Sequence, residues 1–126
     1  MIEATTMADM ARREILPAVE AFAAATAEGA AKKLALIPAL KCAYETELVE
    51  RLTGLTNCIA DKAAALERAM LAVMETEESV NEAFTIRDVV LPRMAELRAV
   101  CDEAETITSK AYWPFPTYGE LLFSVR

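Results

Sequence analysis

Histidine is absent from this chain of 126 residues, and glycine is scarce, with three residues. Without histidine, a serine, threonine or cysteine nucleophile lacks its usual base, and the Glu-x-x-His pairs of two-metal helical proteins cannot form. The glycines Gly29, Gly54 and Gly119 are too far apart to build a phosphate-binding loop. The sequence therefore predicts no catalytic residue, no bound cofactor and no metal site in this chain.

Cysteine pairs and basic clusters are also missing. Cys42, Cys58 and Cys101 include no CxxC pair. On one helix Cys42 and Cys58 would lie roughly 24 Å apart, which is beyond the reach of a disulfide. We expect three reduced cysteines that act as small packing residues.

The net charge is −7, without a block of lysine and arginine. This balance argues against nucleic acid and against an anionic membrane surface as partners. No apolar run reaches the ~18 residues of a membrane-spanning helix. The first residues lack the basic and apolar character of a signal peptide. A cytoplasmic location is therefore the default expectation.

The residues that are abundant favour helices. Hydrophobic residues make up 55% of the chain, aromatic residues only 6%, and alanine, leucine, glutamate, lysine and arginine dominate. Residues 41–75 contain no proline, and their large apolar side chains recur every three, four or seven positions, as on one face of a helix. These are Leu48, Leu52, Leu55, Ile59, Leu66, Met70 and Val73. We predict an all-α fold in which this helix is central.

The full prediction is an antiparallel three-helix bundle over residues 1–111. Its helices are expected at about 6–33, 41–75 and 80–110, with residues 34–40 as the first connection. Capping boxes at residues 6–9 and 79–82 are expected to start the first and third helices.

Pro17 and Pro92 fall inside two of these helices, in similar surroundings at residues 13–17 and 87–92. One interpretation is a kink shared by two neighbouring helices. The other is a chance similarity between short apolar strings.

The last fifteen residues, 112–126, differ from the rest of the chain. They hold five of its eight aromatic residues and two of its five prolines, so we predict an extended strap. Either the strap folds along its own bundle, or it docks on another domain or subunit; both are possible together. The candidate docking residues are Tyr112, Trp113, Pro114, Phe115, Pro116, Tyr118, Leu121, Leu122 and Phe123.

Residues 112–123 of this strap (YWPFPTYGELLF) resemble the carboxyl end of type III glutamine synthetases, the large bacterial form. Residues 9–19 (DMARREILPAV) resemble the entry to that family's C-terminal helical region. Residues 87–92 (RDVVLP) and 94–98 (MAELR) resemble its last long helix. The resemblance covers nearly the whole chain, and its most specific part is the strap.

The resemblance implies a parent enzyme that joins ammonia to glutamate with ATP and Mg or Mn, in ring-shaped oligomers. Its catalytic residues would lie upstream, so none is carried onto a position of this chain. We expect a non-catalytic C-terminal module that serves packing, oligomer assembly or regulation. Its partners would be its own catalytic domain and sister subunits, and in isolation it could form a homo-oligomer. The alternative is a free-standing helical adaptor that binds a protein partner through the aromatic tail. The sequence leaves open whether the chain is a piece of a longer protein or a natural short one.

Overall fold

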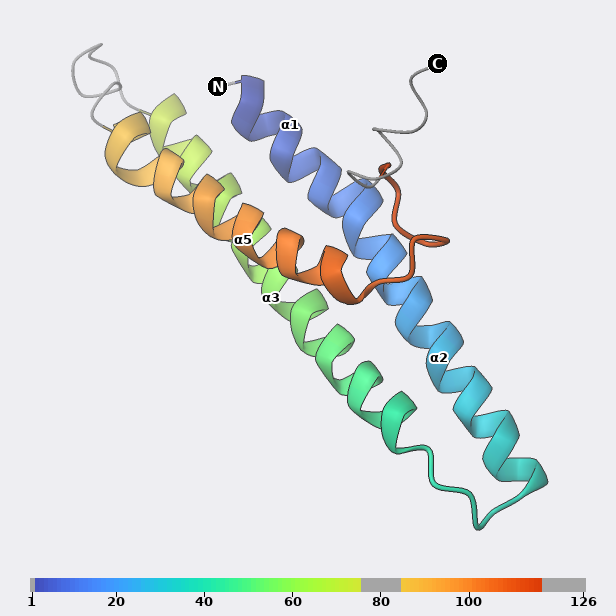
Figure 1. Cartoon of the computed structure of the whole chain (residues 1–126). Helices are drawn as coiled ribbons and strands as arrows, with labels where there is room; N and C mark the ends of the chain where they lie inside the picture. The colour runs from blue at the N-terminus through green and yellow to red at the C-terminus, as the bar shows by residue number, and fades with distance from the viewer. Residues whose placement is uncertain (1, 76–84, 117–126) are drawn as a thin grey trace, which may run out of the picture.

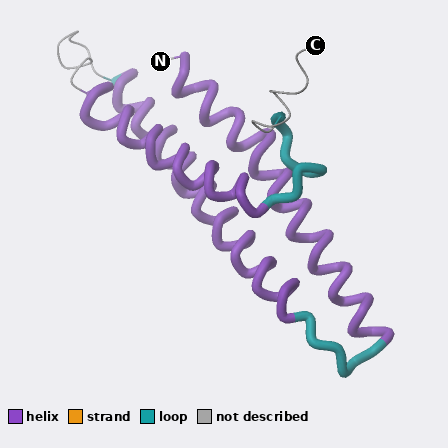
Figure 2. The backbone as a smooth tube through the Cα atoms, in the orientation of Figure 1, coloured by secondary structure: helices purple, strands orange, loops and turns teal. Residues whose placement is uncertain are grey.

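A computed structural model describes residues 2–75 and 85–116, and these residues contain helices and turns but no strand. The first helical run comprises α1 (Ile2–Met10), η1 (Ala11–Ile15) and α2 (Leu16–Leu36). After a connection at residues 37–42, α3 spans Ala43–Met74; η2 (Ile86–Val90) then leads into α5 (Leu91–Ile107). The predicted all-α class is confirmed (Figures 1 and 2).

Helix α3 lies at the centre of the contacts between elements. It packs against α2 and α5, and also contacts α1, η1 and η2. Its buried residues are Leu48, Leu52, Leu55, Ile59, Ala63, Leu66, Ala69 and Val73. This stripe contains six of the seven large residues predicted from the spacing, and the seventh, Met70, is half-buried. The alanines within the stripe let neighbouring helices approach closely.

The two internal prolines share one local structure. Pro17 and Pro92 lie at the start of α2 and α5, and each follows a five-residue π-helical turn, η1 or η2. The N–H of Leu16 donates to the Ala11 carbonyl, and the N–H of Leu91 donates to the Ile86 carbonyl. Proline has no N–H, and its ring crowds the carbonyl four residues before it. A wider turn in front of the proline relieves this crowding within the helical hydrogen-bond pattern. Both turns contact α3, which agrees better with a shared structural feature of the two helices than with chance similarity of their sequences.

The first helix begins at Ile2, four residues before the predicted start. Thr6 lies inside α1, so the predicted capping box does not begin a helix there. Ala4 and Ala8 are buried, which indicates that packing against the core extends the helix past the local capping signal.

The other predicted boundaries differ by a few residues. The first helical run continues to Leu36, so the connection is 37–42 instead of 34–40. α5 ends at Ile107 because Thr108 is extended, with φ −95° and ψ 130°. The capping box at 79–82 and the predicted start at residue 80 lie outside the described residues.

An ion pair joins the first helical run to α3. The guanidinium of Arg12, in η1, donates two hydrogen bonds of 2.7 and 2.8 Å to the carboxylate of Glu67. This bond lowers the pKa of Glu67 and raises the pKa of Arg12. The paired geometry fixes the π turn against α3.

The central position of α3 predicts a large difference between two leucines on it. Leu66 is fully buried, whereas Leu71 is 55% exposed. Leu66→Ala is expected to lower the free energy of unfolding by about 2–5 kcal/mol, because it leaves a cavity. Leu71→Ala is the matched control and should change it by about 0.5 kcal/mol or less. Urea unfolding followed by circular dichroism measures both values; equal losses would contradict the packing described.

The Arg12–Glu67 pair predicts a pH-dependent contribution to stability. Because the pKa of Glu67 is lowered in the folded state, the contribution is complete above the usual glutamate pKa of about 4.3. It disappears as the pH falls through the lower folded-state value. Glu67→Gln should cost roughly 0.5–1 kcal/mol at neutral pH and nothing in strong acid. Glu28→Gln, which breaks the exposed pair with Lys32 within one helix, should cost less at neutral pH.

Candidate functional site: a groove with an acidic rim

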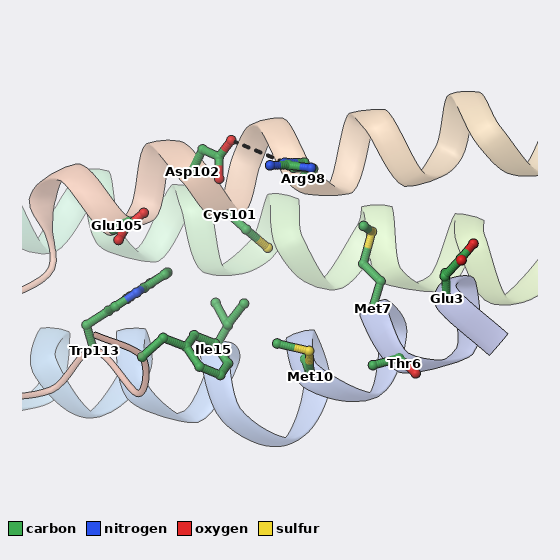
Figure 3. Close-up of a pocket in the computed structure, with 11 residues that line it drawn as sticks. Glu3, Thr6, Met7, Met10, Ile15, Arg98, Cys101, Asp102, Glu105 and Trp113 are labelled. Carbon is green, nitrogen blue, oxygen red and sulfur yellow. Dashed lines mark ion pairs between the residues drawn. The ribbon is translucent and has the colours of Figure 1, made fainter. Parts of the chain in front are cut away.

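A groove lies between the first helical run and α5. Both pack on α3, but α1 and α5 have little contact with each other. The space between them measures about 470 Å³. Glu3 lies at one end of it and Trp113 at the other (Figure 3).

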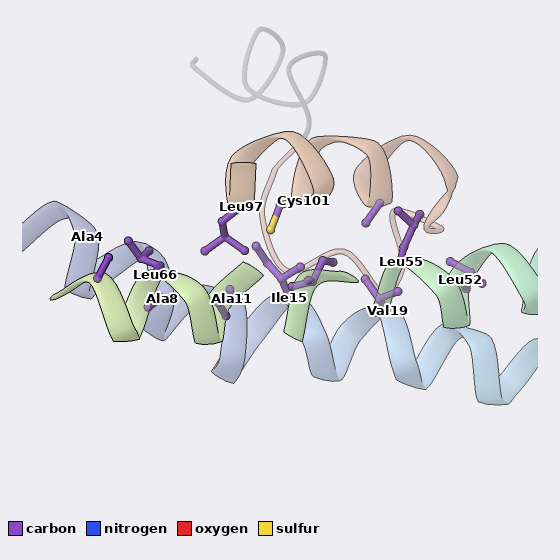
Figure 4. Close-up of a cluster of buried hydrophobic side chains, with 14 of the residues drawn as sticks. Ala4, Ala8, Ala11, Ile15, Val19, Leu52, Leu55, Leu66, Leu97 and Cys101 are labelled. Carbon is purple, nitrogen blue, oxygen red and sulfur yellow. The ribbon is translucent and has the colours of Figure 1, made fainter. Parts of the chain in front are cut away.

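The walls of the groove are apolar. Its apolar lining consists of Met7, Met10, Ile15, Cys101, Trp113 and Phe115. In Figure 4, Leu97 and Cys101 extend from α5 towards the first helical run, where Ile15 lies. Methionine side chains are flexible and polarizable, so this wall can adapt to an apolar occupant.

The rim of the groove is mainly acidic. Glu3 comes from α1, and Asp102 and Glu105 come from α5. Among the described residues, one cation lines it: Arg98, which lies 3.9 Å from the Asp102 carboxylate in an exposed ion pair. The groove is thus suited to an apolar group that carries a positive charge near its edge.

The thiol in the groove is not activated. Burial raises the pKa of Cys101 to about 11, and the nearby Asp102 carboxylate adds to this shift. A nucleophilic cysteine needs a lowered pKa, so this environment acts in the opposite direction. The groove therefore offers a binding surface, and its thiol stays protonated at neutral pH.

Five of the predicted docking residues are described by the structure, and two of them, Trp113 and Phe115, line the groove. The backbone turns at Ser109, whose carbonyl accepts hydrogen bonds from the N–H groups of Tyr112 and Trp113 at 2.9 and 3.0 Å. The ring of Tyr112 lies 5.3 Å from that of Phe22, between centroids. Trp113 and Phe115 are half-buried against the core, with their rings edge to face at 6.4 Å. Pro114 and Pro116 are exposed. Tyr118, Leu121, Leu122 and Phe123 lie outside the described residues.

Two surfaces escaped the sequence reasoning. The first is the α1 side of the groove, because nothing in the spacing of Met7 or Met10 says which helix they face. The second is the connection between α2 and α3, where large apolar residues are exposed. These residues are Leu34, Leu36, Ile37, Leu40 and Tyr44. The available signal was their density in a predicted loop, where a solvated connection normally carries polar residues.

Among residues 2–75 and 85–116, no three acidic or cysteine side chains lie close enough together to hold a metal ion. None of the described helices combines the length and the apolar character needed to cross a membrane.

Comparison with known proteins supports the resemblance drawn from the sequence. The chain is 31% identical, over 99% of its length, to a glutamine synthetase from Butyrivibrio fibrisolvens. It spans only 18% of the length of that curated relative. No protein-family model matches the chain, and no solved structure matches it. The chain thus resembles a fragment of a glutamine synthetase; the assignment to type III stays a prediction.

The raised pKa of Cys101 predicts slow alkylation. At pH 8 its thiolate fraction should be about 100-fold lower than that of a thiol with a pKa near 9, because the two values differ by about two units. Its reaction with iodoacetamide should therefore be at least about 100-fold slower than that of free cysteine and should accelerate up to pH 11. Mass spectrometry of the peptide that contains Cys101 measures the rate. Rapid labelling at pH 8 in the folded protein, with the rate of the urea-unfolded chain as the reference, would show that the thiol is not held in this environment.

Proposed function

We propose that this chain acts as a non-catalytic C-terminal helical module of a type III glutamine synthetase. The observation that carries the proposal is the 31% identity over almost the whole chain to 18% of a glutamine synthetase. Most of that relative's length lies outside the match. The ATP-dependent ligation of ammonia to glutamate, with Mg or Mn, would belong to that remaining part.

The chemistry of the groove supports a non-catalytic role. The thiol of Cys101 is held neutral, and the chain contains no histidine to serve as its base. The carboxylates of Glu3, Asp102 and Glu105 stand at the rim of an apolar space. Such a site binds an occupant but offers no nucleophile and base in contact.

The exposed apolar residues support a role in assembly. Leu36 is 81% exposed and Tyr44 is 74% exposed, and both lie within one short stretch. Contiguous apolar surface of this kind marks contact sites between proteins. The proposed partners are the module's own catalytic domain and sister subunits, in the cytoplasm. The proposal includes the predicted architecture: an antiparallel three-helix bundle over residues 1–111, with 112–126 as a docking strap.

Removal of the strap tests the proposal. In a full-length synthetase that carries this segment, deletion of residues 112–126 is expected to reduce the size of the oligomer and to lower kcat. The physical reason is that Trp113 and Phe115 close one end of the groove, so their removal would leave that end open to water. Sedimentation velocity and a glutamine-formation assay measure the two effects.

Lys110→Ala is the control, because Lys110 is exposed and lies two residues before the strap begins at Tyr112. Unchanged assembly and turnover after the deletion would contradict the assembly role. A pull-down with the isolated chain that consistently recovers an unrelated protein, and no synthetase, would favour the free-standing adaptor.

A further inference from the structure

The connection between α2 and α3 forms an exposed apolar tip. We define the tip as residues 31–44. Five large apolar side chains in it are exposed, from Leu34 at 38% to Leu36 at 81%. α2 and α3 continue past the end of α5 towards the tip, so α5 does not cover it (Figure 1). The tip therefore presents apolar surface that the described part of the chain leaves uncovered.

The tip differs in charge from the rest of this acidic chain. It contains Lys32, Lys33 and Lys41 and no acidic residue. Lys32 and Lys33 are each paired at 3.0 Å, with Glu28 and Glu45 respectively. Lys41 lies in the connection itself and is exposed, so it is the cation best placed to meet a partner.

The groove has the complementary character. Its walls are apolar, and within the described part of the chain its rim carries three carboxylates against one guanidinium. A volume of about 470 Å³ falls within the ~300–1,000 Å³ of pockets that enclose sizeable ligands. An apolar tip that carries a lysine matches this groove in both polarity and charge.

The tip cannot enter the groove of its own chain. Ile15, in the groove wall, and Leu36, in the tip, are ends of one continuous helical stretch of about 30 Å. The occupant, if it is a tip, must therefore come from a second molecule.

We propose that the tip of one copy of this chain binds in the groove of a second copy, with Leu36 and Ile37 against the methionine wall and Lys41 at the acidic rim. The contact is head to tail, because tip and groove are different surfaces. Each copy keeps a free tip or groove for the next one, so the contact builds a ring or a longer array. This inference rests on the proposed assembly role and names the surfaces that would carry it.

The test uses the full chain and two variants that disable one surface each. Leu36→Ser combined with Ile37→Ser changes the tip at exposed positions, and Met10→Glu adds a negative charge inside the acidic groove. The wild-type chain should self-associate with increasing concentration in sedimentation velocity. Each variant alone should associate at least about tenfold more weakly, because each loses apolar contacts and the Met10→Glu carboxylate would have to be desolvated against Leu36 and Ile37.

Mixing the two variants distinguishes this contact from others. The Met10→Glu chain retains its tip, and the tip variant retains its groove, so an equimolar mixture should form 1:1 dimers. Trp113 is the only tryptophan of the chain and lines the groove, so its emission should shift to shorter wavelength on mixing. Leu71→Ser, at an exposed apolar position on α3 outside the tip, is the control and should associate like wild type.

Several results would overturn the proposal. A wild-type chain that stays monomeric at every concentration would exclude the contact. If the groove variant still self-associates, the tip variant does not, and their mixture forms no heterodimer, then the tips pair with each other instead. Tip-dependent binding of the monomer to anionic phospholipid vesicles would assign the tip to a membrane surface. These measurements use the isolated chain, so they can fail while the strap deletion in the parent synthetase still gives its expected result.

Discussion

The burial of one stripe of α3 is the constraint on which the rest of the structure depends. Leu52, Ile59 and Leu66 are completely buried, and they lie about two turns apart along one helix. A single long helix cannot remove such a stripe from water, so α2 and α5 must cover it. At roughly 25 cal/mol per Å² of apolar surface, this burial is the main term that opposes the loss of chain entropy.

The groove is a consequence of the same arrangement. The first helical run approaches α3 through small residues, since Ala4, Ala8 and Ala11 are buried in that contact. α5 covers another part of α3 through Leu97 and Ala104. Both are held in place by α3 rather than by each other. A space lined by their remaining apolar side chains is therefore left between them. The half-buried Trp113 and Phe115 fill one end of that space.

Part of this structure was predictable from local sequence and part was not. The stripe of α3 follows from spacing alone, because a helix of 3.6 residues per turn presents those positions on one side. The start of the first helix does not, because the capping signal at Thr6 is local while the burial of Ala4 depends on a distant helix. Proline marked the positions of both interruptions. It did not show whether the preceding N–H donates to the carbonyl four residues back, as in an α-helix, or five residues back, as in the observed π turns.

The groove shows why a site is harder to predict than a fold. Met7 and Cys101 lie more than ninety positions apart, and only the packing of two helices on a third brings them together. The aromatic strap was recognisable as a candidate because its composition breaks the helical pattern. The tip was not, because the exposure of its leucines depends on where α5 ends relative to α2 and α3, which their local sequence does not show. Long helices thus fix the distance between tip and groove. The surfaces available for contact lie where one helix extends beyond the end of its neighbour, or where two adjacent helices do not touch.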